Sequence, residues 1–168
     1  MREITFTLAR PTPVLNVLMR QNRWDRAKNK RALGREIAAA LGGRLPSEPI
    51  EWARVTVTRF SVGMPDQDGA AGGIKDLLDV LTTPWITPKG QRRNKFGLGL
   101  IRDDDADRCL QVVLCVKCRA AEQRTEVVIE EVGGCVSGKI SGPGIFLDRS
   151  LELLPRPSGH DEMQKGGQ

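Results

Sequence analysis

Residues 3–8, EITFTL, alternate between polar and apolar side chains. A period of two is typical of a strand with one buried face, so we expect a strand here. Residues 51–62 repeat the pattern, with Val55 and Val57 on one face, and predict a second strand. Two further β-rich runs, 110–117 and 125–132, are joined by a polar turn and predict an antiparallel hairpin.

The spacing of apolar residues changes to a helical period in two places. Residues 24–41 predict a long helix that ends at a pair of glycines. A second helix of about ten residues is expected to bury one face, because its apolar positions lie three and four residues apart. Those positions are Ile74, Leu77, Leu78 and Leu81.

The remaining segments carry weaker patterns. Residues 14–22 predict a loop or short turn, and residues 82–96 a basic loop, either functional or a disordered insertion. Residues 145–154 are expected to add a short strand or turn, and residues 155–168 have the composition of a disordered tail. The pattern therefore predicts one α+β domain over residues 1–154, with helices packed on a small mixed sheet.

Composition narrows the range of partners. The 168 residues carry a net charge of +5 and a pI of about 9.3, which favours an acidic partner, most commonly nucleic acid, over a merely soluble basic surface. No window resembles a membrane span or a signal peptide, so we expect a cytoplasmic protein with no membrane partner. The chain has no tyrosine, and its one histidine, His160, lies in the polar tail. Acids and lysines remain for catalysis.

Basic residues gather at two places. Runs of this kind are either solvated faces or surfaces that contact phosphates. The residues expected to bind DNA lie in the first helix and in the basic loop: Arg23, Arg26, Lys28, Lys30, Arg31, Lys89, Arg92, Arg93 and Lys95.

Two acidic clusters lie beside predicted strands. Asp66 and Asp68 follow the second strand, and residues 103–105 are three consecutive aspartates. If the sheet brings the two clusters together, their carboxylates repel one another unless a cation such as Mg²⁺ neutralises them. The alternative is that both clusters are exposed turns, where aspartate is common. The glycines before Lys75 do not form a nucleotide-binding P-loop, because their spacing is wrong and Asp76 follows the lysine.

Four cysteines raise the question of a zinc site. Cys115 and Cys118 have the C-x-x-C spacing, with Cys109 and Cys135 as further candidates. However, Cys115 lies within an apolar β run and would share a strand face with Cys109 and not with Cys118. The favoured interpretation is that the cysteines pack within or on the surface of the strand.

Taken together, these segments resemble the RusA-like family of Holliday-junction resolvases, especially its phage and prophage members. The resemblance covers residues 1–133. It rests on their order: a basic helix, an acid-x-acid turn at Asp66 and Asp68, a glycine-rich bend before Lys75, an LLDVL helix, and GLGLIRDDD before the last strands.

The resemblance implies a homodimeric endonuclease that cleaves four-way DNA junctions during recombination and repair. The implied cofactor is Mg²⁺, with Mn²⁺ as an alternative. The implied metal ligands are Asp66, Asp68 and Asp104, with Asp103 alongside, and Lys75 is the implied catalytic lysine. Asp79 matches a recurrent helix acid to which no role is assigned.

One departure from the family keeps other functions open. Family members commonly carry Asn-Leu directly after the second acid, where this chain has Gly69 and Ala70. The first alternative is therefore a DNA-binding protein on the same scaffold that does not cleave. The second is a nucleic-acid-binding domain without preference for junctions.

Overall fold

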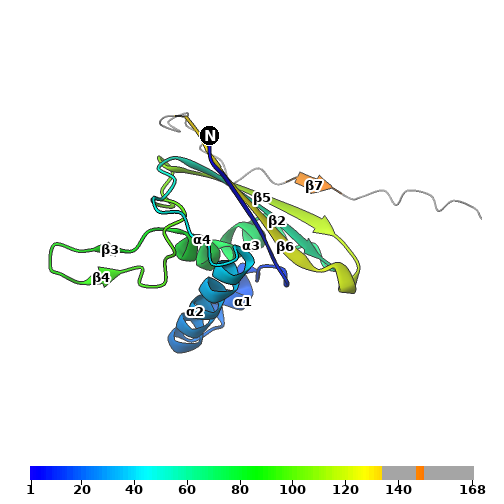
Figure 1. Cartoon of the computed structure of the whole chain (residues 1–168). Helices are drawn as coiled ribbons and strands as arrows, with labels where there is room; N and C mark the ends of the chain where they lie inside the picture. Colours follow the sequence, from blue (N-terminus) through cyan, green and yellow to red (C-terminus); the bar gives the residue numbers. More distant parts are fainter. Residues whose placement is uncertain (134–146, 150–168) are drawn as a thin grey trace, which may run out of the picture.

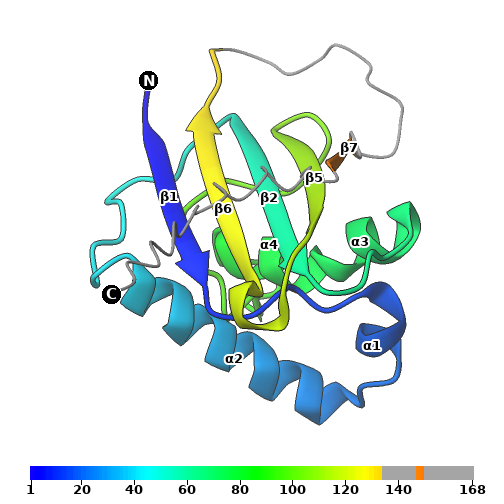
Figure 2. The ribbon, with the colours of Figure 1, turned by 90° about the vertical axis from the view of Figure 1, so that its right-hand side faces the viewer.

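The computed structural model describes residues 1–133 and 147–149. A five-stranded sheet is covered on one face by helices (Figure 1 and Figure 2). The elements, in chain order, are β1 (Glu3–Leu8), α1 (Leu15–Met19), α2 (Arg23–Ala40), β2 (Ala53–Ser61), α3 (Gln67–Gly73), α4 (Lys75–Leu81), β3 (Trp85–Ile86), β4 (Arg92–Arg93), β5 (Cys109–Lys117), the 3₁₀ turn η1 (Ala120–Glu122), β6 (Arg124–Glu131) and β7 (Leu147–Arg149).

The strand order is β1-β6-β2-β5-β7. β1 and β2 pair with β6 in antiparallel fashion, whereas β5 pairs with both β2 and β7 in parallel. The prediction of a β5–β6 hairpin is therefore wrong, because β2 lies between these two strands. The central strand, β2, is therefore hydrogen-bonded along both edges. The chain passes from β5 to β6 across the end of β2 through η1.

The core lies between the sheet and the helices. β2 buries Val55 and Val57, as its alternation predicted, and β6 buries Val127 and Ile129. The predicted α+β class with a mixed sheet is confirmed. No helix in the part of the chain that the structure describes combines the length and apolar character needed to span a membrane.

The long basic helix is confirmed as α2. It begins after Asn22, whose side-chain oxygen accepts the backbone N–H groups of Trp24 and Asp25. The segment before it was predicted as a loop or short turn, but it forms the short helix α1. α1 is held by packing, since Leu18 is buried and Leu15 covers Gly72 of α3.

The glycine-rich bend is also helical. Residues 67–73 form α3, where only a bend was predicted. The helix predicted after the bend is present as α4, with seven residues instead of about ten. Asp66 caps α3, because its carboxylate accepts the backbone N–H of Gly69 at 3.0 Å. A Cβ on Gly69 would lie 2.2 Å from that carboxylate oxygen, so glycine at this position makes room for the cap.

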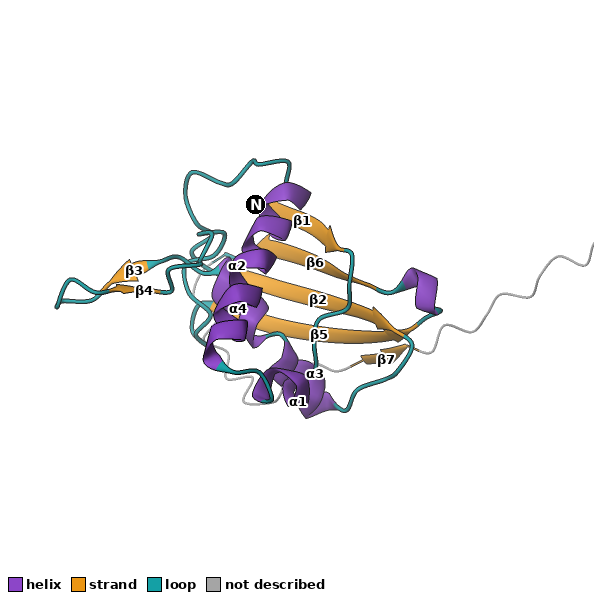
Figure 3. Cartoon of the chain, turned by 90° about the horizontal axis from the view of Figure 1, so that it is seen from below, coloured by secondary structure: helices purple, strands orange, loops and turns teal. Residues whose placement is uncertain are grey.

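The basic loop contains a two-stranded hairpin of β3 and β4 that projects away from the sheet (Figure 3). Trp85 pairs with Arg93 and Ile86 with Arg92. The basic loop predicted over residues 82–96 therefore contains regular structure, which does not fit the alternative of a disordered insertion. The predicted strand within residues 145–154 is present as β7, while the predicted tail at 155–168 lies outside the described residues.

Candidate functional site

A groove of about 940 Å³ runs between α2, α4, the β3–β4 hairpin and the loop that follows Ile101. We call the side formed by α2 and the hairpin, which is basic, the rim. We call the side formed by α4 and the loop, which carries both signs of charge, the floor; it contains Lys75, Asp79, Asp103 and Asp104. α4 presents its exposed face, which carries Lys75, to the groove. Its buried face packs Leu77, Leu78 and Leu81 into the core, and this packing fixes the position of Lys75.

The structure divides the residues predicted to bind DNA into two sets. Those that line the groove are Arg23, Arg26, Lys30, Arg92, Arg93 and Lys95. Those that do not are Lys28, Arg31 and Lys89. Arg31 instead lies over the ring of Phe96, with its guanidinium carbon 5.6 Å from the ring centroid. Two elements far apart in the sequence, α2 and the hairpin, thus contribute to one basic rim.

Arg26 and Lys30 also join α2 to α4. Asp76 is buried, and it accepts hydrogen bonds of 2.6–3.1 Å from Arg26 while Lys30 lies 3.3 Å away. Lys30 makes a second ion pair with Asp79. The bond to Asp76 raises the pKa of Arg26 above its ordinary value. These pairs set the position of the basic helix against the helix that carries Lys75.

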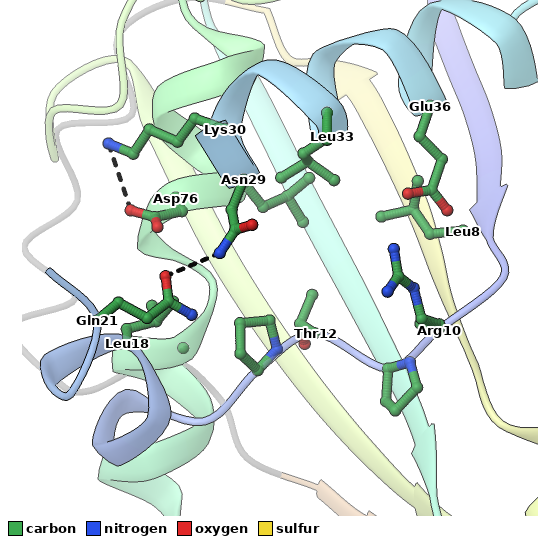
Figure 4. Close-up of a pocket in the computed structure, with 15 residues that line it drawn as sticks. Leu8, Arg10, Thr12, Leu18, Gln21, Asn29, Lys30, Leu33, Glu36 and Asp76 are labelled. Atoms are coloured by element: carbon green, nitrogen blue, oxygen red, sulfur yellow. Dashed lines mark hydrogen bonds and ion pairs between the residues drawn. The ribbon is translucent and has the colours of Figure 1, made fainter. Parts of the chain in front are cut away.

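Figure 4 shows Lys30 reaching from α2 toward Asp76, at one end of a smaller cavity of about 310 Å³. Lys30 lines both this cavity and the groove. Asn29 donates to Gln21 at 3.1 Å in the same view, so a second contact ties α2 to the segment that precedes it.

Asp104 is a half-buried acid of the groove. Partial burial raises its pKa, and the nearby charges of Asp79 and Asp103 raise it further, while Lys75 lowers it. Asp103 is exposed and accepts the backbone N–H of Asp104 at 2.9 Å. The loop is also held from the sheet, where Gln111 donates to the carbonyl of Asp104 at 3.0 Å. A cation beside Asp104 would relieve the repulsion among these acids.

Asp66 and Asp68 do not line the groove. Asp66 caps α3 and Asp68 lies exposed in its first turn. The remainder of α3 and Ile74 lie between these acids and Lys75, at the start of α4. Across residues 1–133 and 147–149, no three His, Cys, Asp or Glu side chains form a group suited to a metal ion. The predicted ligand roles of Asp66 and Asp68 therefore stay predictions.

The groove floor nevertheless has chemistry that fits Mg²⁺. Magnesium takes hard oxygen ligands and often uses only one or two carboxylates, with waters and a substrate phosphate completing its shell. Asp104, with Asp79 and Asp103 close enough to raise its pKa, supplies such oxygens next to a basic rim. These residues would hold a Mg²⁺ ion whose remaining ligands include the phosphate of a bound substrate.

The three cysteines that the structure describes provide no comparable donors. Burial raises the pKa of Cys109 to about 12, with a smaller contribution from the neighbouring aspartates, so the thiol stays protonated at neutral pH. Cys115, on the same strand face, is buried as well, and Cys118 is half-buried after the strand ends. Cys135 lies outside the described residues.

Three residues of the site carried no predicted role. Asp76 and Asp79 lie three residues apart on α4. They form ion pairs with Arg26 and Lys30, which lie four residues apart on α2. The opposite charges at matching helical spacings could have indicated that the two helices pack together. Asn94 gave no such signal. Its side-chain amide donates to the carbonyl of Asp79 at 2.7 Å, which fixes the base of the hairpin to α4.

The raised pKa of Asp104 predicts a stability effect. Its carboxylate form is disfavoured in the folded state, so its ionisation costs stability once the pH exceeds the folded-state pKa, and the cost disappears as the pH falls toward the unfolded-state value. We expect Asp104→Asn to raise the Tm at neutral pH, by an amount that shrinks on acidification. Thermal melts across pH would measure this.

Asp107→Asn, an exposed position in the same loop, is the matched control for that series. A lower Tm for Asp104→Asn at neutral pH would show that the carboxylate makes a stabilising contact, contrary to the electrostatic argument.

Comparison with protein-family models, with curated proteins and with solved structures found no match for this chain, so its resemblance to the RusA-like resolvases rests on its own residues.

Proposed function

We propose that this protein binds DNA along the basic groove and cleaves phosphodiester bonds there in a Mg²⁺-dependent reaction, with four-way junctions as substrates. Mn²⁺ is the alternative ion. The single observation that carries the proposal is the placement of Lys75 and Asp104 together on the floor of a groove with a basic rim. A phosphate backbone is the partner that this charge pattern fits.

The rim residues would hold the backbone. Arg92, Arg93 and Lys95 project from one side, and Arg23 faces the groove from the start of α2. Their contacts to phosphates fix the position of the DNA without reading its sequence, and they make binding weaker as salt rises.

The floor residues would act on the phosphate. Mg²⁺ bound at Asp104 would supply a polarised phosphate and an activated water. Lys75 would stabilise the negative charge that develops on the phosphate oxygens, because its ammonium is exposed toward the groove and lies near Asp104. A homodimer, as the resemblance implies, would place two such floors on the two strands cut at a junction.

A second candidate is DNA binding without cleavage. The observation that favours it is the position of Asp66 and Asp68, which leaves the groove floor without the acid-x-acid pair that the resemblance assigns to the metal. The basic rim would remain functional in this case.

Both candidates can be tested with one set of substrates. The protein would be incubated with a labelled four-way junction and with linear duplex of matched sequence, in Mg²⁺ or in EDTA, and both binding and nicking would be measured. Symmetric nicking of the junction in Mg²⁺, lost in Asp104→Asn, is the expected result. Asp107→Asn is the control.

Tight junction binding with no nicking in Mg²⁺ or Mn²⁺ would contradict the proposed nuclease activity and support the second candidate, DNA binding without cleavage. Equal affinity for junction and duplex would remove the junction preference. Retention of full nicking by Asp104→Asn would move the active site away from the groove floor.

A further inference from the structure

The β3–β4 hairpin exposes large apolar side chains far from the core. It stands clear of the sheet and helices (Figure 1), and Trp85 and Ile86 are 55% and 71% exposed. A tryptophan ring in water forgoes a large burial energy, so such a residue on a projecting element points to a partner.

The pairing of the hairpin places a cation beside each apolar side chain. Trp85 lies directly opposite Arg93, and Ile86 directly opposite Arg92. Residues directly opposite in an antiparallel pair share a face, so one face of the hairpin carries the indole together with a guanidinium. Flat rings next to cations suit a base that stacks while its phosphate is neutralised.

The base of the hairpin is fixed to the candidate site. Asn94 donates to the carbonyl of Asp79, and the backbone N–H of Leu98 donates to the carbonyl of Val80 at 2.8 Å. Both acceptors belong to α4, the helix that carries Lys75. Trp85 and Lys75 line the same groove, so the indole has a defined place relative to the groove floor.

We propose that Trp85 stacks on an unpaired base next to the phosphate held on the groove floor. The preferred partner is therefore nucleic acid with unstacked bases beside a branch, and continuous duplex is a poorer ligand because its bases are already stacked. This inference rests on the proposed function, since it assigns the class of DNA that the same groove binds.

The test compares the affinity of fluorescently labelled forked DNA, which has two single-stranded arms, with that of fully paired duplex. Trp85→Ala is expected to weaken fork binding by roughly tenfold, the loss expected for one stacked base, and to change duplex binding less than about twofold. Trp85→Phe should restore most of the fork affinity, since it keeps an aromatic face. Trp52→Ala is the control, because Trp52 is 37% exposed but does not line the groove.

Fork affinity that Trp85→Ala leaves unchanged, while the wild-type protein binds DNA, would overturn this inference and leave the proposed function standing. Equal weakening of fork and duplex binding would also overturn it, because it would show that the indole contacts the backbone. A wild-type protein that binds neither DNA would overturn the proposed function and the inference together.

Discussion

Gly73→Ala is expected to lower the free energy of unfolding by about 3 kcal/mol, the upper range for an overpacked core. A Cβ at this position would lie 2.0 Å from the carbonyl oxygen of Pro13 and 3.1 Å from the Cα of Val14. Both are backbone atoms, which cannot move aside as a flexible side chain would. The segment before α1 or the end of α3 would therefore have to shift.

Urea titration followed by circular dichroism would measure the loss. The matched control is Gly63→Ala, where a Cβ meets nothing within 4 Å and the backbone does not adopt a positive φ. A loss below about 1 kcal/mol would mean that the two segments separate easily at this contact. Because Gly73 lies two residues before Lys75, a shift here would also displace the groove floor.

Lys75→Gln is expected to reduce the proposed cleavage of a four-way junction by roughly 100- to 1000-fold, the range seen when one preorganised charge-stabilising donor is removed. The loss should fall on the rate of the bound complex, since Lys75 is one of several cations around the groove. The affinity for DNA should change far less. The slope of the logarithm of the affinity against the logarithm of the salt concentration should fall by about one, which corresponds to the loss of one phosphate contact.

Single-turnover cleavage and equilibrium binding, measured on the same substrate, would separate these effects. Lys28→Gln is the control, because Lys28 is an exposed lysine of α2 that does not line the groove. Parallel losses in binding and cleavage would make Lys75 a binding residue alone, and unchanged cleavage would exclude it from the reaction.

Local patterns predicted the elements whose signal is strong. β1, β2 and α2 were found because their apolar periods are regular and the two glycines at 42 and 43 mark the end of α2. Strand order was not predictable in the same way, since the periods of β5 and β6 do not say which edge each strand pairs with. Because the connection between β5 and β6 is short, a hairpin of these two strands was the simpler assumption. In the structure β2 lies between β5 and β6.

The candidate site was predictable in part for a related reason. The carboxylate of Asp66 can cap a helix or bind a metal with the same oxygens. Only the course of the chain after it shows that it accepts a hydrogen bond from the backbone N–H of Gly69. Lys75 and Asp104, which the resemblance assigns to one site, both line the groove, and their roles stay predictions. The contribution of the hairpin to that groove depends on a long-range contact through Asn94, which no local pattern encodes.

The strand order has a consequence for how the protein folds as it is synthesised. Every ladder of the five-stranded sheet includes β5 or β6, so β1 and β2 have no strand partner in the sheet until residues beyond 108 have been made. At elongation rates of about 5 to 20 residues per second, the gap between β2 and β5 lasts on the order of 2 to 10 seconds. During that time the valine-rich β2 is an unpaired, aggregation-prone segment. Nascent chains of this protein are therefore expected to depend on chaperones until β5 emerges.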